Sequence, residues 1–270
     1  MMKTSNPLVL LCDLTYTQAT LASEVMPAAV GSLGAFLLEH TNGPLDIEIY
    51  KYPQKLIEDL ERWHNNRPVQ IVGFSNYVWN LNLSLAFANA IKKHFPETII
   101  VFGGPNFPDE PDEQEEFLLK YPVIDFHVIK EGEVAFCDLV THLIKNQFDK
   151  TNISTEIKNI AYINNNSFFS QSSEVERIMD LSVIPSPYTT GLLDSFFDGS
   201  LQPIVQTVRG CPFLCTFCTE GKGYWTKVRK LSQDRVSEEL NYIAKKITSI
   251  DSKSRCDLYI ADSNFGMYPA

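Results

Sequence analysis

The sequence predicts an α/β fold, with an N-terminal doubly wound sheet of five parallel strands followed by the first units of a β/α barrel. Three observations predict this class. Short apolar runs alternate with amphipathic segments of helical length through residues 1–147. A polar, proline-containing stretch interrupts the alternation over residues 148–200. A strand, a helix and a second strand then follow within residues 201–270.

Five strand–helix pairs are expected in the first domain. The strand segments are apolar or alternating, and they span residues 8–14, 46–52, 69–75, 98–104 and 125–133. The helical segments span residues 26–40, 54–63, 82–95, 113–121 and 136–146. Nearly continuous apolar strands joined by helices favour a parallel sheet that is covered on both faces. Right-handed crossovers then give a doubly wound, flavodoxin-like sheet.

Ligands of such sheets bind beyond the carboxyl ends of the strands. We therefore expect a ligand to bind at the loops that follow the first, third, fourth and fifth strands. These loops are residues 13–17, 75–79, 103–107 and 131–133.

Residues 148–200 are predicted to be a linker that packs on the surface. Asn, Ser and Thr dominate its first half, and Pro185 and Pro187 interrupt the second. A short hairpin is expected inside it at residues 160–170, where two apolar runs flank three asparagines.

The last part of the chain is expected to form a strand, a helix and a strand at residues 203–210, 232–247 and 257–265. Ser232 is the expected N-cap of this helix. A complete β/α barrel takes about 250 residues. Residues 201–270 are therefore expected to be an incomplete barrel, and the chain a fragment of a longer protein.

Composition narrows the class of partner. The chain has 270 residues and a formal net charge of −10, which argues against a nucleic-acid partner. No apolar run reaches the ~18 residues of a membrane span. The N-terminal apolar run is short and interrupted by Asp13, unlike a signal peptide. We expect a cytoplasmic protein with no membrane span.

Three of the six cysteines, Cys211, Cys215 and Cys218, fall within eight residues. Their C-x3-C-x2-C spacing favours an iron–sulfur cluster, because one tight loop brings three thiolates to one core. Three thiolates on a four-iron cluster leave one iron open to a substrate or cofactor. A structural zinc site is the alternative, with a fourth ligand from Cys256 or a histidine. The scattered Cys12, Cys137 and Cys256 are expected to be buried structural thiols.

The cysteine loop, with Arg209-Gly210 before it and Phe217 before its last cysteine, resembles the signature of the radical S-adenosylmethionine (SAM) superfamily. The resemblance implies a [4Fe-4S] cluster on the three cysteines, with SAM chelating the open iron. One-electron reduction, by a reductant such as flavodoxin or ferredoxin, then cleaves SAM to methionine and a 5′-deoxyadenosyl radical. Phe217 would contact the adenine. Asp262 is a candidate for binding the SAM amine, or else a polar cap at a strand end.

A five-unit sheet before such a loop resembles the cobalamin (B12)-binding radical SAM enzymes. Four features carry the resemblance, in order along the chain: Ser75, the Gly103-Gly104-Pro105 turn, the Lys130-Glu131-Gly132-Glu133 loop and residues 184–188. It implies cobalamin binding by Ser75, Gly103, Gly104, Glu131 and Gly132. Glycines let a backbone approach a large flat ligand closely.

The loop after the first strand departs from the D-x-H-x-x-G pattern of many B12 domains, because residues 13–18 contain no histidine. The histidines elsewhere, His40, His64, His94, His127 and His142, are expected in the core or on the surface. Cobalamin is therefore expected without a lower-axial histidine.

The resemblance implies methyl transfer to an unactivated carbon or phosphorus, or a radical rearrangement or cyclisation, on an unknown small-molecule or peptide substrate. Two alternatives stay open. One is a flavodoxin-like binding or electron-transfer module with a cluster-binding appendage. The other is an inactive fragment of a radical SAM enzyme.

Overall fold

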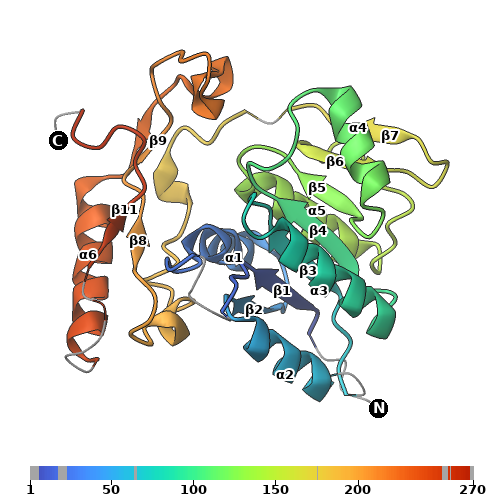
Figure 1. The fold of residues 1–270 in the computed structure, drawn as a ribbon, viewed down its shortest axis with the longest axis horizontal. Helices are drawn as coiled ribbons and strands as arrows, with labels where there is room; N and C mark the ends of the chain where they lie inside the picture. The colour runs from blue at the N-terminus through green and yellow to red at the C-terminus, as the bar shows by residue number, and fades with distance from the viewer. Residues whose placement is uncertain are drawn as a thin grey trace. The chain divides into compact units, whose positions relative to one another are not determined.

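A computed structural model describes residues 6–17, 23–63, 66–174, 176–250, 255 and 257–267. The chain divides into two compact units (Figure 1). The first unit comprises Met1–Ser23 and Ala29–Glu176. The second comprises Glu24–Ala28 and Arg177–Ala270. Cys256 and His64 lie outside the described residues.

The first unit is built on a sheet with the strand order β2-β1-β3-β4-β5-β6-β7 among its described residues. The first five strands are mutually parallel, as predicted. Their bounds are β1 Leu8–Cys12, β2 Asp46–Tyr50, β3 Ile71–Ser75, β4 Ile99–Gly103 and β5 Phe126–Val128. The order of these five strands is the doubly wound, flavodoxin-like order that the sequence predicts. The chain changes direction across the sheet between β1 and β3.

Helices cover the two faces of this sheet. They are α1 Ala28–His40, α2 Pro53–Trp63, α3 Leu81–His94, α4 Pro111–Lys120 and α5 Glu133–Lys145. One core cluster joins alternate residues of β1 (Leu8, Leu10 and Cys12) to apolar residues of α2, α3 and α4. Phe136 of α5 approaches the sheet beside Leu11 and Gly73 instead. Both faces are thus buried, which is why the strand segments read as nearly continuous apolar runs.

The expected hairpin is present, and it extends the sheet. β6 (Ile160–Ile163) pairs antiparallel with β5 and with β7 (Phe169–Gln171). Residues 148–174, expected to be a surface linker, therefore lie in the first unit. β5 has only three residues and would otherwise leave an unpaired edge, which the hairpin covers.

The second unit contains short strands around one long helix. β8 (Ile204–Val205) pairs parallel with β11 (Tyr259–Ile260), and β9 (Val208–Arg209) pairs antiparallel with β10 (Arg229–Lys230). The expected strand 203–210 is thus broken into two. α6 (Gln233–Thr248) begins at the predicted cap, where Ser232 Oγ accepts a hydrogen bond from the Arg235 amide. Short 3₁₀ turns complete the unit: η1 Leu181–Val183, η2 Asp194–Phe196, η3 Thr219–Gly221 and η4 Gly223–Trp225.

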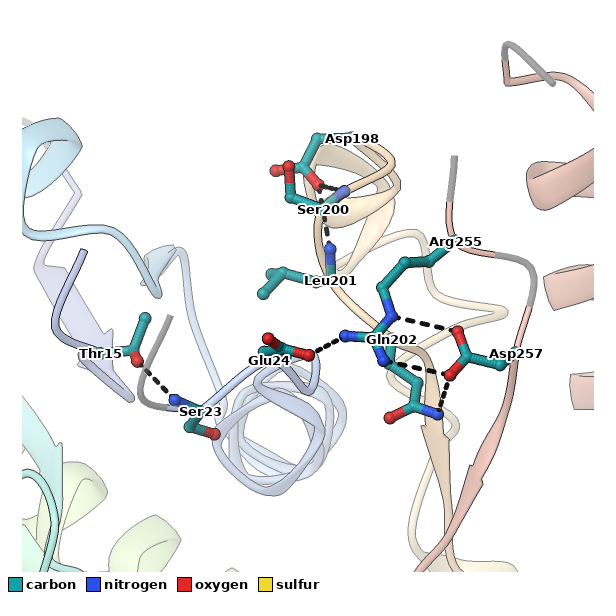
Figure 2. A network of polar contacts seen from close by, with 9 residues as sticks. All are labelled: Thr15, Ser23, Glu24, Asp198, Ser200, Leu201, Gln202, Arg255 and Asp257. Atoms are coloured by element: carbon teal, nitrogen blue, oxygen red, sulfur yellow. Dashed lines mark hydrogen bonds and ion pairs between the residues drawn. The ribbon is translucent and has the colours of Figure 1, made fainter. Parts of the chain in front are cut away.

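Residues 24–28 join the second unit through polar contacts (Figure 2). The Gln202 amide donates to the Glu24 carbonyl at 2.7 Å, and the Gln202 side chain donates to Asp257 at 2.7 Å. Arg255 pairs with both Asp257 and Glu24. These contacts hold the residues just before β8 beside the residues just before β11.

Residues 184–188, one of the features behind the cobalamin resemblance, pack inside the second unit. Tyr188 is buried, and its hydroxyl donates to the Ile204 carbonyl at 2.7 Å while accepting from the Ile204 amide at 3.0 Å. The Tyr188 hydroxyl therefore satisfies both the amide and the carbonyl of Ile204, the first residue of β8. Among the described residues, no helix has the length and apolar character needed to cross a membrane.

Candidate functional site

The carboxyl ends of β1 and β3 meet at a buried polar network. Lys51 Nζ donates to Asp13 Oδ2 at 2.8 Å, and Ser75 Oγ donates to Asp13 Oδ1 at 2.6 Å. Asn80 Nδ2 donates to Ser75 Oγ at 2.9 Å, and Asn80 Oδ1 accepts from the Tyr77 amide. Ser75, predicted to reach a cofactor, is therefore occupied by the side chains of Asp13 and Asn80.

Lys51 is the residue of this network that sequence reasoning missed. It is 1% exposed, although it directly follows β2, which lies at the edge of the sheet. Its Nζ also lies 3.3 Å from Ser23 Oγ. The Ser23 amide donates to Thr15 Oγ1 at 2.8 Å (Figure 2). Lys51 thus ties together the two described ends of the loop between β1 and α1.

The turn after β4 brings the backbone of two loops together. Gly104 has φ +135°, and a Cβ built on it would lie 2.7 Å from the Asn76 carbonyl oxygen. The Asn76 amide donates to the Gly103 carbonyl at 2.7 Å. Asn76 Nδ2 donates to the Asn106 carbonyl, and Asn106 Nδ2 donates to Asn76 Oδ1. Gly104 is therefore required by the approach of the β3 loop, whereas Gly103 has ordinary contacts with Val128.

The loop after β5 leads directly into α5. Glu131 lies in this loop, and Gly132 is the N-cap, whose carbonyl accepts from the Phe136 amide at 2.8 Å. A Cβ on Gly132 would lie 3.2 Å from Leu33 of α1. The predicted residues Ser75, Gly103, Gly104, Glu131 and Gly132 thus all follow strand ends on the same edge of the sheet.

Exposed apolar side chains gather on the loops after β1 and β3. Val78 is 78% exposed and Trp79 48%, and Tyr16 is also exposed. The Tyr77 and Trp79 rings stack at a centroid distance of 4.5 Å and an interplanar angle of 7°. Burial, with the Asp13 carboxylate second, raises the pKa of Tyr77 to about 12. Large exposed apolar side chains at a binding edge indicate a surface for an apolar or flat ligand.

His127 is a core residue. It is fully buried on β5, its ring stacks on Phe107 at 3.7 Å, and its Nε2 lies 3.2 Å from Asn76 Nδ2. Burial lowers its pKa to about 3. On the described parts of the four edge loops the sequence places no histidine. The described parts of these loops offer exposed apolar surface, which suits a flat ligand such as a corrin.

The cysteine loop of the second unit connects β9 to η3. The Cys211 amide donates to the Trp225 carbonyl at 3.0 Å, and the Cys218 amide donates to the Cys215 carbonyl at 3.1 Å. Gly210 has φ +100° and passes close to the Trp225 and Lys227 carbonyls, while Gly221 passes close to the Cys215 backbone. The loop is therefore folded back on itself, with Cys215 and Cys218 exposed.

Arg177 braces the segment that faces Cys211. Its guanidinium donates to the Tyr224 and Lys227 carbonyls at 2.9 Å each, and lies over the Trp225 ring at 5.1 Å. The carbonyl between them, that of Trp225, receives the Cys211 amide. No sequence pattern signals this brace, because the contacts span 47 and 50 residues.

The three thiols do not converge on one point in the structure. Among the described residues, no three His, Cys, Asp or Glu side chains are grouped as metal ligands. The chemistry of the donor set nevertheless fits an iron–sulfur cluster, because three accessible or partly accessible thiols lie on one short loop. Phe217 is 91% exposed beside them.

Asp262, considered for SAM, caps strand ends in the structure. Its Oδ1 accepts from the Thr207 amide at 2.7 Å and the Val208 amide at 3.0 Å, and its Oδ2 accepts from the Thr207 hydroxyl. Asn264, which the sequence did not single out, places its Nδ2 3.0 Å from Cys211 Sγ.

The buried cysteines agree with the sequence prediction. Cys12 and Cys137 are buried, and burial raises the pKa of both thiols. Fold and site together define an α/β chain in which a doubly wound, ligand-binding type of domain precedes a cysteine-bearing β/α segment.

Comparison with known proteins agrees with this class. Residues 17–140 match the family model described as B12 binding domain. The chain is 29% identical over 208 residues to the cobalamin-dependent radical SAM methyltransferase TokK of Streptomyces tokunonensis. It is 28% identical over 205 residues to the 2-(S-pantetheinyl)-carbapenam-3-carboxylate methyltransferase of Streptantibioticus cattleyicolor. Each alignment covers 74% of this chain and 28% of the relative.

Among solved structures, that of the cobalamin-dependent radical enzyme OxsB, with aqua-cobalamin and S-adenosylmethionine bound, superposes with a TM-score of 0.72. The match covers 96% of this chain and 34% of that one, at 20% identity, and so shows a shared fold. The chain therefore carries a B12 binding domain and is similar to cobalamin-dependent radical SAM enzymes. It spans about a quarter of the length of the curated relatives that it matches.

Proposed function

We propose that this chain is the cobalamin-binding and cluster-binding part of a radical SAM enzyme that transfers a methyl group. The observation that carries the proposal is the C-x3-C-x2-C loop in a chain that also carries a B12 binding domain. The loop follows β9, close in sequence to the carboxyl end of the parallel β8–β11 pair. Active sites of β/α folds lie at that end of their strands.

Cobalamin would bind at the carboxyl edge of the first unit. Gly103, Gly104 and Gly132 lie at this edge, and Glu131 supplies a carboxylate there. Tyr16, Val78 and Trp79 supply exposed apolar surface. Ser75 would act indirectly, by fixing Asp13 and Asn80, since its hydroxyl already contacts both.

Cys211, Cys215 and Cys218 would hold the iron–sulfur cluster. Such a cluster, when bound, supplies one electron to SAM at an iron that carries no protein thiolate. Phe217, exposed beside the last cysteine, is available to stack on the adenine. Asp262 would hold the β8–β9 turn, because both its oxygens already accept hydrogen bonds there.

Methyl transfer is favoured over cyclisation because both relatives that align with 74% of the chain are named methyltransferases. The substrate, a small molecule or a peptide, would be selected largely by residues outside the aligned region. A low-potential protein such as flavodoxin or ferredoxin would supply the electron.

Two measurements on the full chain test the proposal. After anaerobic reconstitution with iron and sulfide, the protein is incubated with dithionite and SAM, and methionine and 5′-deoxyadenosine are quantified by mass spectrometry. It is separately mixed with hydroxocobalamin and desalted. We expect SAM cleavage that is lost in Cys215→Ala, and retention of cobalamin in both proteins. A cluster-loaded protein that leaves SAM intact, or one that retains a flavin and no cobalamin, would contradict the proposal.

A further inference from the structure

The turn after β11 presents an amide to the sulfur of the first loop cysteine. Asn264 Nδ2 lies 3.0 Å from Cys211 Sγ, across 53 residues of sequence. The amide nitrogen carries two N–H donors, and a thiolate can only accept. When Cys211 is deprotonated, as an iron ligand must be, this contact is an N–H···S hydrogen bond from Asn264 to the sulfur.

Strand topology explains why the two residues meet. β8 and β11 are parallel, with Tyr259 opposite Ile204 and Ile260 opposite Val205. The carboxyl ends of parallel strands lie at one edge. The segment that leads from β8 toward Cys211 and the turn that contains Asn264 therefore leave the pair at the same edge.

The turn that carries Asn264 is held on both sides. Asp262, two residues before it, accepts hydrogen bonds from the Thr207 and Val208 amides at 2.7 and 3.0 Å. Ser263 donates to the Glu220 carboxylate. The Met267 amide donates to the Asn264 carbonyl at 3.2 Å. The side chain of Asn264 is therefore oriented before any ligand binds, which is how supporting residues fix a site.

The backbone of Cys211 is also fixed by a hydrogen bond. Its amide donates to the Trp225 carbonyl at 3.0 Å, and Gly210, with φ +100°, lets the chain pass close to that carbonyl. Of the three loop cysteines it is also the one that is half-buried. A hydrogen bond to its sulfur is therefore partly shielded from competing water.

We propose that Asn264 is a positioning residue that tunes the cluster held by Cys211. The inference rests on the cluster assignment of the proposed function. Reduction adds one electron to the cluster, breaks no bond and increases the negative charge on the sulfur ligands. A donor hydrogen-bonded to one of those sulfurs stabilises the reduced form and raises the reduction potential.

Three variants of the full chain test the proposal. Asn264→Asp keeps the shape and replaces the donor with a carboxylate, and Asn264→Leu keeps the size without donor or charge. Phe265→Leu, on the same turn at a side chain that is 67% exposed, is the matched control. Each is reconstituted anaerobically, its iron is counted, and the fraction reduced is measured by electron paramagnetic resonance in a dithionite-poised redox titration.

At the wild-type midpoint, we expect the ratio of reduced to oxidised cluster to fall about tenfold in both Asn264 variants, equivalent to about 59 mV for a one-electron couple. Phe265→Leu should keep the wild-type ratio. An Asn264 variant with full iron content and the wild-type ratio would overturn the proposal. Loss of iron in both Asn264 variants, with native circular dichroism and full iron in Phe265→Leu, would support a requirement for the contact. A wild-type protein that takes up no iron would refute the cluster assignment itself.

Discussion

Lys51 and Asp13 form an ion pair that is almost completely removed from water, with the ammonium 2.8 Å from the carboxylate. Two further polar groups complete the arrangement: Ser75 donates to Asp13, and Ser23 lies 3.3 Å from the ammonium. A buried pair contributes little over an apolar replacement, but removing one partner leaves an uncompensated buried charge. The network therefore specifies the shape of the loops after β1 and β3 more than it adds to stability.

Lys51→Met should destabilise the first unit by about 3–5 kcal/mol, because Asp13 is left buried without its counter-charge. Urea unfolding monitored by circular dichroism measures the change. Lys55→Met is the control, because Lys55 is exposed and its 3.4 Å pair with Asp59 is worth at most about 1 kcal/mol. Equal, small effects in the two variants would show that the Lys51 pair is not buried in solution.

His127 gives the fold a defined dependence on pH. Burial lowers its pKa to about 3, whereas in the unfolded chain it is near 6.5. Below pH 6.5 His127 binds a proton in the unfolded state but stays neutral in the folded state. Protonation of the unfolded chain therefore lowers the free energy of unfolding as the pH falls.

Between about pH 6.5 and 5 the free energy of unfolding should fall by up to about 1.4 kcal/mol per pH unit on account of His127. Urea unfolding across this range checks the slope, and His127→Phe, which keeps a ring against Phe107, should remove that part of it. A His127→Phe slope equal to that of the wild type would show that His127 is protonated in the fold.

Elements buried on both faces were predictable, and long-range pairings were not. β1 and β3 read as strands because every residue of each is buried. The β6–β7 hairpin was visible from its turn, but nothing local marks β5 as its neighbour. The expected strand 203–210 broke because Asp262, far along the chain, captures the Thr207 and Val208 amides.

The same distinction holds within the sites. The cysteine triplet was readable because its members are close in sequence, and the glycine turns were readable because they follow apolar runs. Lys51, Arg177 and Asn264 act across 38 to 53 residues, on partners that no short pattern contains.

At the scale of the element, the turn after β4 yields a prediction. Gly104→Ala should destabilise the first unit by about 3 kcal/mol or more, from a φ that only glycine adopts readily and from a Cβ 2.7 Å from the Asn76 oxygen. Gly43→Ala is the matched control, because Gly43 has φ +123° and nothing within 4 Å of the added Cβ. It should cost about 1–3 kcal/mol, from backbone strain alone.

Thermal or urea unfolding of the two alanine variants measures their loss of stability. The difference between them separates the cost of the steric contact with Asn76 from the cost of backbone strain. If Gly104→Ala is no worse than Gly43→Ala, the approach of the Asn76 loop to the turn is looser than the structure shows. The same variants should also differ in cobalamin retention, since only Gly104 lies at the carboxyl edge of the sheet.

At the scale of the whole molecule, the proposed function assigns two cofactors to separate parts of one chain. The B12 binding domain model matches residues 17–140, and the cysteine loop lies in the second unit. Both sites would act in a single protein, with cobalamin retention depending on the first unit and iron content on the second.

Iron content after anaerobic reconstitution tests the central claim most directly. We compare the wild type with Cys215→Ala and with Cys137→Ala, which removes a buried thiol of the first unit. We expect about four iron atoms per chain in the wild type, as for a [4Fe–4S] cluster. We expect a similar content in Cys137→Ala and little or none in Cys215→Ala. A wild type that binds no iron, or a Cys215→Ala variant that binds as much as the wild type, would contradict the proposed function.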